Sequence, residues 1–159
     1  MKEATATAQI ITPIGMVELT ADRDNLVSVR IDPHEGTEQL YHGSAVLDEA
    51  VAQMRAYFAR ERQDFDLPLL PLATSRGNAL REGIASVPYG ETRTYGALAR
   101  QIDSAPRAVG QACKRNPFPI IIPCHRITTS AGPENYSGGA GIATKAWLND
   151  FEQEARRLL

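Results

Sequence analysis

The residues best suited to chemistry lie in one short stretch, residues 120–127, with the sequence IIIPCHRI. Three β-branched apolar residues followed by a proline predict a short buried strand. A core strand has no structural need for a thiol, an imidazole and a guanidinium at its end, because burying a charge or an unpaired imidazole costs several kcal/mol. The stretch indicates either a reactive thiol at Cys124 or, more simply, an inert buried cysteine beside a surface His-Arg pair.

The composition limits the class of protein. The chain has 159 residues, of which 43% are hydrophobic and 23% charged, which is ordinary for one large globular domain or two small ones. It contains no apolar run long enough to span a membrane and no signal-peptide core at its start, so we expect a cytoplasmic protein, or a nuclear one if the source has a nucleus.

Cysteine and histidine usage argues against a metal site. The two cysteines, Cys113 and Cys124, and the three histidines lack the paired spacing of zinc ligands, and two cysteines do not make a disulfide framework. We therefore expect no metal and no cofactor. Cys124 is then a free thiol, and we expect Cys113 to fill space on its helix.

Positive charge is concentrated in one segment although the net charge is −2. Between residues 93 and 126 the only acid is Asp103, and the basic residues are Arg93, Arg100, Arg107, Lys114, Arg115 and Arg126. A local basic face can hold a polyanion even on a weakly acidic protein. The asymmetry therefore indicates a polyanionic partner.

The amino-terminal part of the chain predicts a small sheet with one helix. Residues 8–12, 16–20 and 26–31 alternate between apolar and polar types and are separated by turn residues, which predicts an antiparallel meander. Ser44 is placed to cap a helix that ends near Phe58. The proline-containing segment 63–73 predicts a linker, so we assign residues 1–73 to a first domain and 74–159 to a second.

The second domain begins with helical patterns. A helix is predicted to start near Thr74 and to stop at the Pro-Tyr-Gly sequence of residues 88–90. A short helix over 95–102, capped by Thr92 or Thr94, precedes a break and a helix from Pro106 to about Arg115. Two short helices joined by a tight break, with a basic second helix, predict a helix-turn-helix.

The second of these helices carries small residues along one side, at positions 105, 108, 110 and 112. A smooth basic helix can bring its backbone close to DNA, whereas base readout requires longer side chains. The alternative is an ordinary core helix whose small residues allow tight packing.

The last predicted helix, residues 142–158, places a carboxylate near its apolar stripe. Leu148, Phe151, Ala155, Leu158 and Leu159 share one face, and Glu152 follows Leu148 by four residues. A carboxylate that leans inward is costly unless it is paired, so Glu152 requires a partner such as an imidazole. Alternatively, Glu152 lies at the rim of the stripe in water.

Several short motifs follow one another across residues 87–152. They are IPCHRI at 122–127, PYGET at 88–92 leading into Tyr95, RAVG at 107–110 with Asn116-Pro117, and NYSGG at 135–139 with Lys145, Trp147, Leu148 and Glu152. In these motifs the chain resembles the O6-alkylguanine-DNA alkyltransferase family. The resemblance implies an α/β (α+β) fold: an RNase H-like first domain with a three-stranded antiparallel sheet and a helix, then a helical, winged-helix-like domain containing the helix-turn-helix.

The resemblance also implies a reaction. Cys124 would take the alkyl group from O6 of guanine, and from O4 of thymine as a second substrate, in a displacement that leaves a thioether. His125, acting through a water, would activate the thiol, and Glu152 would orient the imidazole. Neighbouring residues on a strand point to opposite faces, so His125 can act on Cys124 only through a bridging water or with a bend at Pro123. Because no group hydrolyses a thioether, each chain would react once.

Duplex DNA containing O6-alkylguanine is the implied partner, approached from the minor groove by a monomer. The damaged nucleotide would be flipped out, and Arg107 would fill the vacated position. Ala108 and Gly110 would allow close approach, and Tyr95 would contact the phosphate and base of the flipped nucleotide. The remaining implied site residues are Asn116, which braces the turn after the recognition helix, Arg126, in substrate and DNA binding, and Ser137, in the guanine pocket.

The sequence departs from the family pattern at two places. Many members carry Phe-Gln and a Trp in the helix before the Pro-Tyr-Gly sequence, where this chain has Arg76-Gly77 and Arg81. The segment 140–144 is slightly longer than usual before Lys145. These departures affect domain packing and the rim of the pocket rather than the proposed nucleophile.

Three other functions compete with this interpretation. A non-catalytic lesion binder of the alkyltransferase-like class would lack the nucleophile, but Cys124 is present. A cysteine hydrolase using Cys124 and His125 would require an oxyanion hole and would have no use for a smooth basic helix. A transcription factor is disfavoured because small residues do not reach base edges.

Overall fold

The computed structural model describes residues 5–41, 43–130 and 138–157. The chain forms two compact units, Met1–Leu70 and Pro71–Leu159. The division lies within the proline-containing segment 63–73. No helix in the described ranges is long and apolar enough to cross a membrane.

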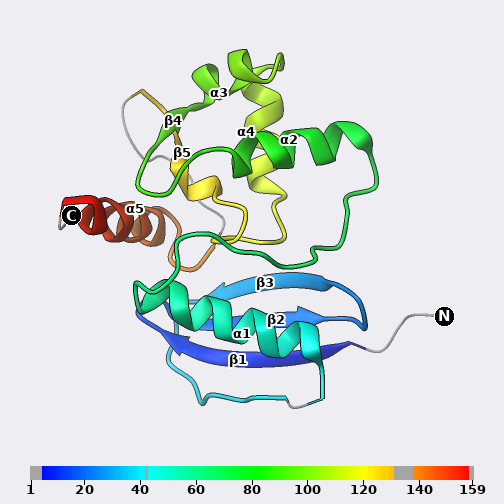
Figure 1. Ribbon diagram of the computed structural model, residues 1–159. Helices are drawn as coiled ribbons and strands as arrows, with labels where there is room; N and C mark the ends of the chain where they lie inside the picture. The colour runs from blue at the N-terminus through cyan, green and yellow to red at the C-terminus, as the bar shows by residue number, and fades with distance from the viewer. Residues whose placement is uncertain (1–4, 42, 131–137, 158–159) are drawn as a thin grey trace. The chain divides into compact units, whose positions relative to one another are not determined.

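The amino-terminal unit is an antiparallel sheet packed on one helix, as the alternation predicted. Strands β1 (Ala6–Thr12), β2 (Gly15–Ala21) and β3 (Leu26–Asp32) are hydrogen-bonded in that order. Helix α1 (Ala45–Phe58) runs across one face of this sheet (Figure 1). Ser44 caps it, with its side-chain oxygen 3.1 Å from the backbone nitrogen of Leu47. The fully buried side chains of Leu47 and Met54 close the core against the sheet.

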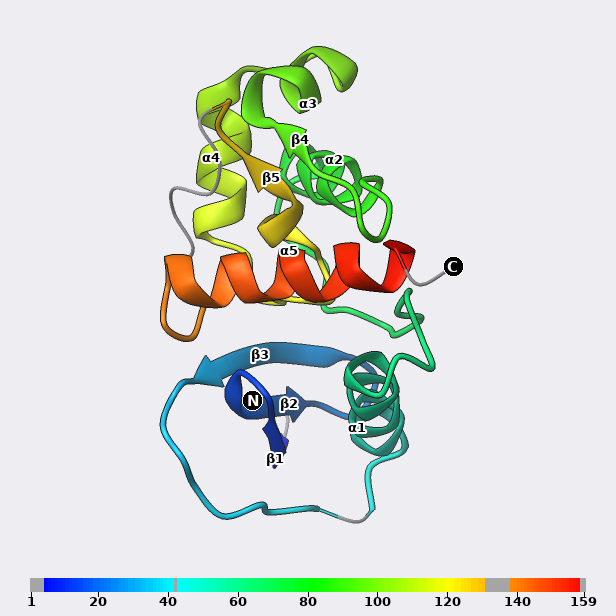
Figure 2. The same cartoon turned by 90° about the vertical axis from the view of Figure 1, so that its left-hand side faces the viewer.

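The carboxy-terminal unit is mainly helical. Its elements are α2 (Ser75–Ala85), β4 (Arg93–Thr94), α3 (Tyr95–Gln101), α4 (Pro106–Lys114), the 3-10 turn η1 (Cys124–Arg126), β5 (Ile127–Thr128) and α5 (Ile142–Arg157). Strands β4 and β5 pair in parallel and lie between α3 and α5 (Figure 2). Thr94, and not Thr92, caps α3, because its hydroxyl accepts a hydrogen bond from the Ala97 amide at 3.0 Å. The predicted helices are confirmed.

The break between α3 and α4 is a tight turn over residues 102–105. Asp103 has a positive φ of 53°, and the Ser104 amide returns to the Ala99 carbonyl at 2.8 Å. Pro106 is the first residue of α4, where a missing N–H costs nothing. This turn leaves Arg107 exposed at the start of α4.

The predicted strand at residues 120–122 is wrong. These residues form turns, Ile120 has a positive φ of 76°, and the Cys124 amide donates to the Ile122 carbonyl at 2.8 Å. The prolines at 119 and 123 lack the N–H groups that a ladder requires, so the segment satisfies its hydrogen bonds locally. Ile120 and Ile122 are nevertheless buried, so their apolar character came from the core and not from a sheet.

Candidate active site

Asn116 holds the turn that presents Cys124. Its side-chain amide donates to the Ile122 carbonyl at 2.8 Å and lies 3.3 Å from the Cys124 sulfur, and its oxygen accepts from the Phe118 amide at 3.0 Å. One side chain therefore fixes both ends of the turn and contacts the thiol. These contacts support the bracing role that the resemblance implies for Asn116. Cys124 itself is 4% exposed.

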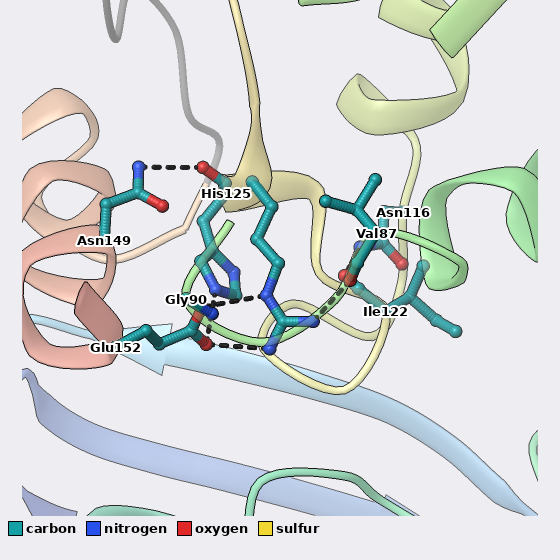
Figure 3. Close-up of polar contacts among 8 residues, drawn as sticks. Val87, Gly90, Asn116, Ile122, His125, Asn149 and Glu152 are labelled. Carbon is teal, nitrogen blue, oxygen red and sulfur yellow. Dashed lines mark hydrogen bonds and ion pairs between the residues drawn. The ribbon is translucent and has the colours of Figure 1, made fainter. Parts of the chain in front are cut away.

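Glu152 of α5 meets His125 inside the carboxy-terminal unit. Oε2 of Glu152 lies 2.9 Å from Nε2 of His125, and both side chains are buried (Figure 3). The inward carboxylate thus has the imidazole partner that its helical position predicted, and the alternative of a solvated rim position is wrong. Asn149, one turn earlier on α5, donates to the His125 carbonyl at 2.9 Å and fixes the backbone of η1.

The pair sets the tautomer of His125. Burial alone would raise the pKa of Glu152, but hydrogen bonds and charge from His125 and Arg126 hold it below its ordinary value. Burial lowers the pKa of His125 more than Glu152 raises it, so the imidazole is neutral at neutral pH. An ionised carboxylate only accepts hydrogen bonds, so Nε2 carries the proton and Nδ1 keeps a lone pair. Nδ1 is buried and has no hydrogen-bond partner among the described residues.

Burial raises the pKa of the Cys124 thiol, and the Asn116 hydrogen bond and the positive charge of Lys145 oppose that shift. The resting group is therefore a thiol and requires a base when it reacts. Consecutive residues of a 3-10 turn point about 120° apart, so a direct hydrogen bond from His125 to the sulfur is not expected. Burial also raises the pKa of the Cys113 thiol, to about 12.

Lys145 is a site residue to which the sequence gave no role. It is fully buried on α5, its ammonium lies 5.7 Å from the centre of the Tyr95 ring, and its charge lowers the pKa of Cys124. A detectable pattern existed, because Lys145, Leu148 and Glu152 are spaced three and four residues apart and share one helix face. A lysine on the buried face of a helix is costly, so its position indicates an electrostatic role.

Arg126, which the resemblance assigned to substrate and DNA binding, is buried inside the carboxy-terminal unit. Its guanidinium is buried and donates to both oxygens of Glu152, from Nε at 2.8 Å and from Nη2 at 2.9 Å. Its Nη1 donates to the Val87 carbonyl at 2.8 Å. The charge is used inside the unit to keep the carboxylate ionised.

The structure describes most, but not all, of the residues predicted to contact DNA. Tyr95 begins α3 and is partly buried, and Arg107 is exposed near the start of α4. A Cβ added at Gly110 would meet nothing within 4 Å in the described structure, so packing inside the chain does not require glycine there. Ala108 is partly buried on the same helix. Ser137 lies outside the described residues.

The buried pair predicts an acid-sensitive carboxy-terminal unit. The folded-state pKa of His125 lies below 6.5 and that of Glu152 below 4.5. Below pH 6.5, His125 binds a proton more readily in the unfolded chain than in the folded one. Below pH 4.5, the same holds for the carboxylate of Glu152. Falling pH therefore favours unfolding. We expect the unfolding free energy to fall by up to about 1.4 kcal/mol per pH unit for each group.

Trp147, the only tryptophan, lies on α5 and allows this unit to be followed by fluorescence during urea unfolding. The urea midpoint should decrease from about pH 7 downward, and the substitution His34→Gln, at an exposed histidine, should not change that decrease. A midpoint that stays constant down to about pH 4 would contradict the assigned states of the pair.

These features define a protein with one buried cysteine beside a histidine-carboxylate pair, which is the arrangement of an activated thiol nucleophile. Comparison with known proteins agrees. Residues 78–154 match the family described as 6-O-methylguanine DNA methyltransferase, DNA binding domain. The chain belongs to this family, the methylated-DNA-protein-cysteine methyltransferases.

Relatives match over most of their length. The methyltransferase of Methanosarcina acetivorans is 37% identical over 82% of this chain and 88% of its own. The constitutive methyltransferase of Bacillus subtilis is 33% identical over 89% of this chain and 92% of its own. The crystal structure of the Mycobacterium tuberculosis O6-methylguanine methyltransferase superposes with a TM-score of 0.80 at 32% identity, covering 95% of this chain and 94% of that one.

Proposed function

We propose that this protein repairs O6-alkylguanine in DNA by transferring the alkyl group to the sulfur of Cys124. The observation that carries this proposal is the Asn116-held thiol next to a neutral histidine whose proton is fixed on Nε2 by Glu152. Its relatives are methylated-DNA-protein-cysteine methyltransferases, which supports this substrate class.

The reaction follows from the charges of the site. The thiol proton passes through a bridging water to Nδ1 of His125, and the sulfur attacks the alkyl carbon. The carbon-oxygen bond breaks, and its electron pair stays on O6 of the guanine. The imidazolium that forms is stabilised by the ionised Glu152 carboxylate 2.9 Å away, and the Lys145 charge favours the sulfur anion. The product is a thioether, so each chain reacts once.

DNA binding is assigned to the two helices α3 and α4, acting as a helix-turn-helix. A structure of the Mycobacterium tuberculosis relative in complex with DNA, with a TM-score of 0.77 at 34% identity, supports a DNA partner. Arg107 and the small residues Ala108 and Gly110 favour approach to the minor groove, which carries little base code and suits repair at any sequence. The target base lies inside the duplex, so the nucleotide is flipped out before transfer.

The finer fold assignments belong to the same proposal. The three-stranded antiparallel sheet with α1 supports an RNase H-like amino-terminal unit. The α3–α4 pair with the short β4–β5 pair supports a winged-helix-like carboxy-terminal unit. We propose that the protein acts as a monomer, because one chain contains all the described groups that the reaction requires.

The test is intact-mass analysis after incubation with a duplex that contains one O6-methylguanine. We expect one added methyl group per chain, mapped by peptide analysis to Cys124, and a yield of repaired DNA that equals the amount of protein. A hydrolase would leave the protein unmodified while turning over many substrates, and a non-catalytic binder would leave both protein and DNA unchanged.

Arg107 provides a separate prediction about the DNA step. Arg107→Ala is expected to slow repair of duplex DNA roughly 10- to 100-fold, because the flipped state loses the side chain that fills the stack. Reaction with the free base O6-benzylguanine, which requires no flipping, should change less than about twofold. The rates of both reactions are measured by the loss of the free thiol of Cys124.

Arg100→Ala removes the same charge from an exposed position on α3 and serves as the matched control. It should weaken duplex repair only slightly, through the general phosphate attraction. Equal slowing of the duplex and free-base reactions by Arg107→Ala would indicate a folding defect instead of a lost DNA contact.

A further inference from the structure

A cavity of about 400 Å³ lies within the carboxy-terminal unit. It opens between α2, α4 and the turn that follows α4, and Cys124, His125 and Glu152 are not among its lining residues. Leu80 and Ile84 of α2, Ala112 of α4 and Ile122 of the turn give it apolar walls. A hollow of this size and character is typical of a small-molecule site.

The charged groups around this cavity all have one sign. Arg76, Arg81 and Arg115 line it, and no aspartate or glutamate does so among the described residues. Arg76 and Arg115 are exposed, and the Arg81 guanidinium stacks over the Phe118 ring with its carbon 5.1 Å from the ring centre. Planar guanidinium groups bind carboxylates in a paired geometry and stack on aromatic rings. The cavity therefore favours a ligand with a flat apolar body and one negative charge.

The cavity coincides with the positions at which α2 departs from the family pattern. Arg76-Gly77 and Arg81 replace the Phe-Gln and Trp that many members carry, and all three residues line the cavity. Glycine contributes no side chain to fill the space, and arginine adds positive charge at its wall. The cavity thus lies where this chain departs from the pattern that many members carry.

We propose that this cavity is a binding site for a small planar aromatic carboxylate. The ring would lie between α2 and α4 on Leu80, Ile84 and Ala112, and the carboxylate would meet the arginines. Asn116 and Ile122 line the cavity, and Asn116 also contacts the Cys124 sulfur, so an occupant would touch the turn that holds the thiol. The test of this site requires neither DNA nor alkyl transfer.

Calorimetric titration of the full-length chain with 2-naphthoate tests this site. We expect saturable binding of one molecule per chain with a Kd on the order of 1 mM or tighter. The neutral analogue 2-naphthamide should bind roughly 10-fold more weakly, because it cannot form a charge-assisted pair.

Two substitutions distinguish the contribution of the arginine charge to binding from that of the cavity volume. Arg81→Leu should weaken naphthoate roughly 10-fold and leave naphthamide nearly unchanged, whereas Ala112→Leu should fill the cavity and weaken both ligands at least about 10-fold. Arg23→Gln removes an exposed charge in the amino-terminal unit and should have no effect. Trp147 fluorescence during urea unfolding verifies that each variant is folded.

Three results would overturn the proposal. One is the absence of saturable 2-naphthoate binding by the full-length chain. Another is equal affinity for naphthoate and naphthamide. The third is binding that survives Ala112→Leu in a folded protein.

Discussion

Replacing Cys124 with alanine is expected to abolish alkyl transfer, with a loss of at least about 10⁴-fold relative to the native chain. The proposed reaction stores the alkyl group on sulfur, so no other atom of the site can replace it. The other cysteine of the chain, Cys113, is a buried free thiol on α4. The measurement is the rate of methyl loss from an O6-methylguanine duplex under single-turnover conditions.

Cys113→Ala is the matched control for this prediction. It removes a buried thiol of the same size from the neighbouring helix and should leave the transfer rate within about fivefold of the native value. Cys124→Ala should still bind the lesion duplex, because neither Arg107 nor the small face of α4 is changed. Transfer that persists in Cys124→Ala, or that is lost equally in Cys113→Ala, would remove Cys124 from its proposed role.

The sequence predicted the elements that depend on local patterns. The alternation in residues 6–31, the cap at Ser44, the helix start near Thr74 and the cap at Thr92 or Thr94 were predicted without reference to distant residues. Helical spacing also gave the inward position of Glu152, as one of two alternatives. These features were predictable because period and capping are properties of neighbouring residues.

The errors occurred where tertiary contacts decide the structure. The apolar run at 120–122 is consistent with a strand, but the amide of Asn116 accounts for the Ile122 carbonyl, and the flanking prolines prevent a ladder. Arg126 belongs to a basic segment, and only the folded chain shows that it faces Glu152 across 26 residues. A charge count along the sequence cannot distinguish a buried ion pair from a surface contact.

Glu152→Gln is expected to have two separate effects. First, it leaves Arg126 as a buried charge without its carboxylate, which should cost about 3–5 kcal/mol in unfolding free energy. Second, it removes the negative charge that stabilises the imidazolium of His125, which should slow transfer roughly 10²- to 10⁴-fold. Because instability alone can reduce activity, the single variant does not separate a catalytic role from a structural one.

A second substitution separates them. In Arg126→Met the buried guanidinium is absent. The double variant Glu152→Gln with Arg126→Met therefore leaves no guanidinium without its carboxylate, and it should regain most of the lost stability, to within about 2 kcal/mol of the native chain. Its transfer rate should remain as low as that of Glu152→Gln alone. Arg126→Met by itself should retain more transfer than either variant, because Glu152 still holds the Nε2 proton of His125.

The double-variant cycle therefore measures stability and transfer on the same four proteins. Stability is read from urea unfolding followed at Trp147 on α5, the helix that carries Glu152. Transfer is read from single-turnover kinetics with the free base, so that DNA binding does not contribute. If Glu152 acts through His125, the two substitutions couple strongly in stability, while the rate follows residue 152 alone. A double variant that regained both stability and rate would show that the carboxylate only balances the charge of Arg126.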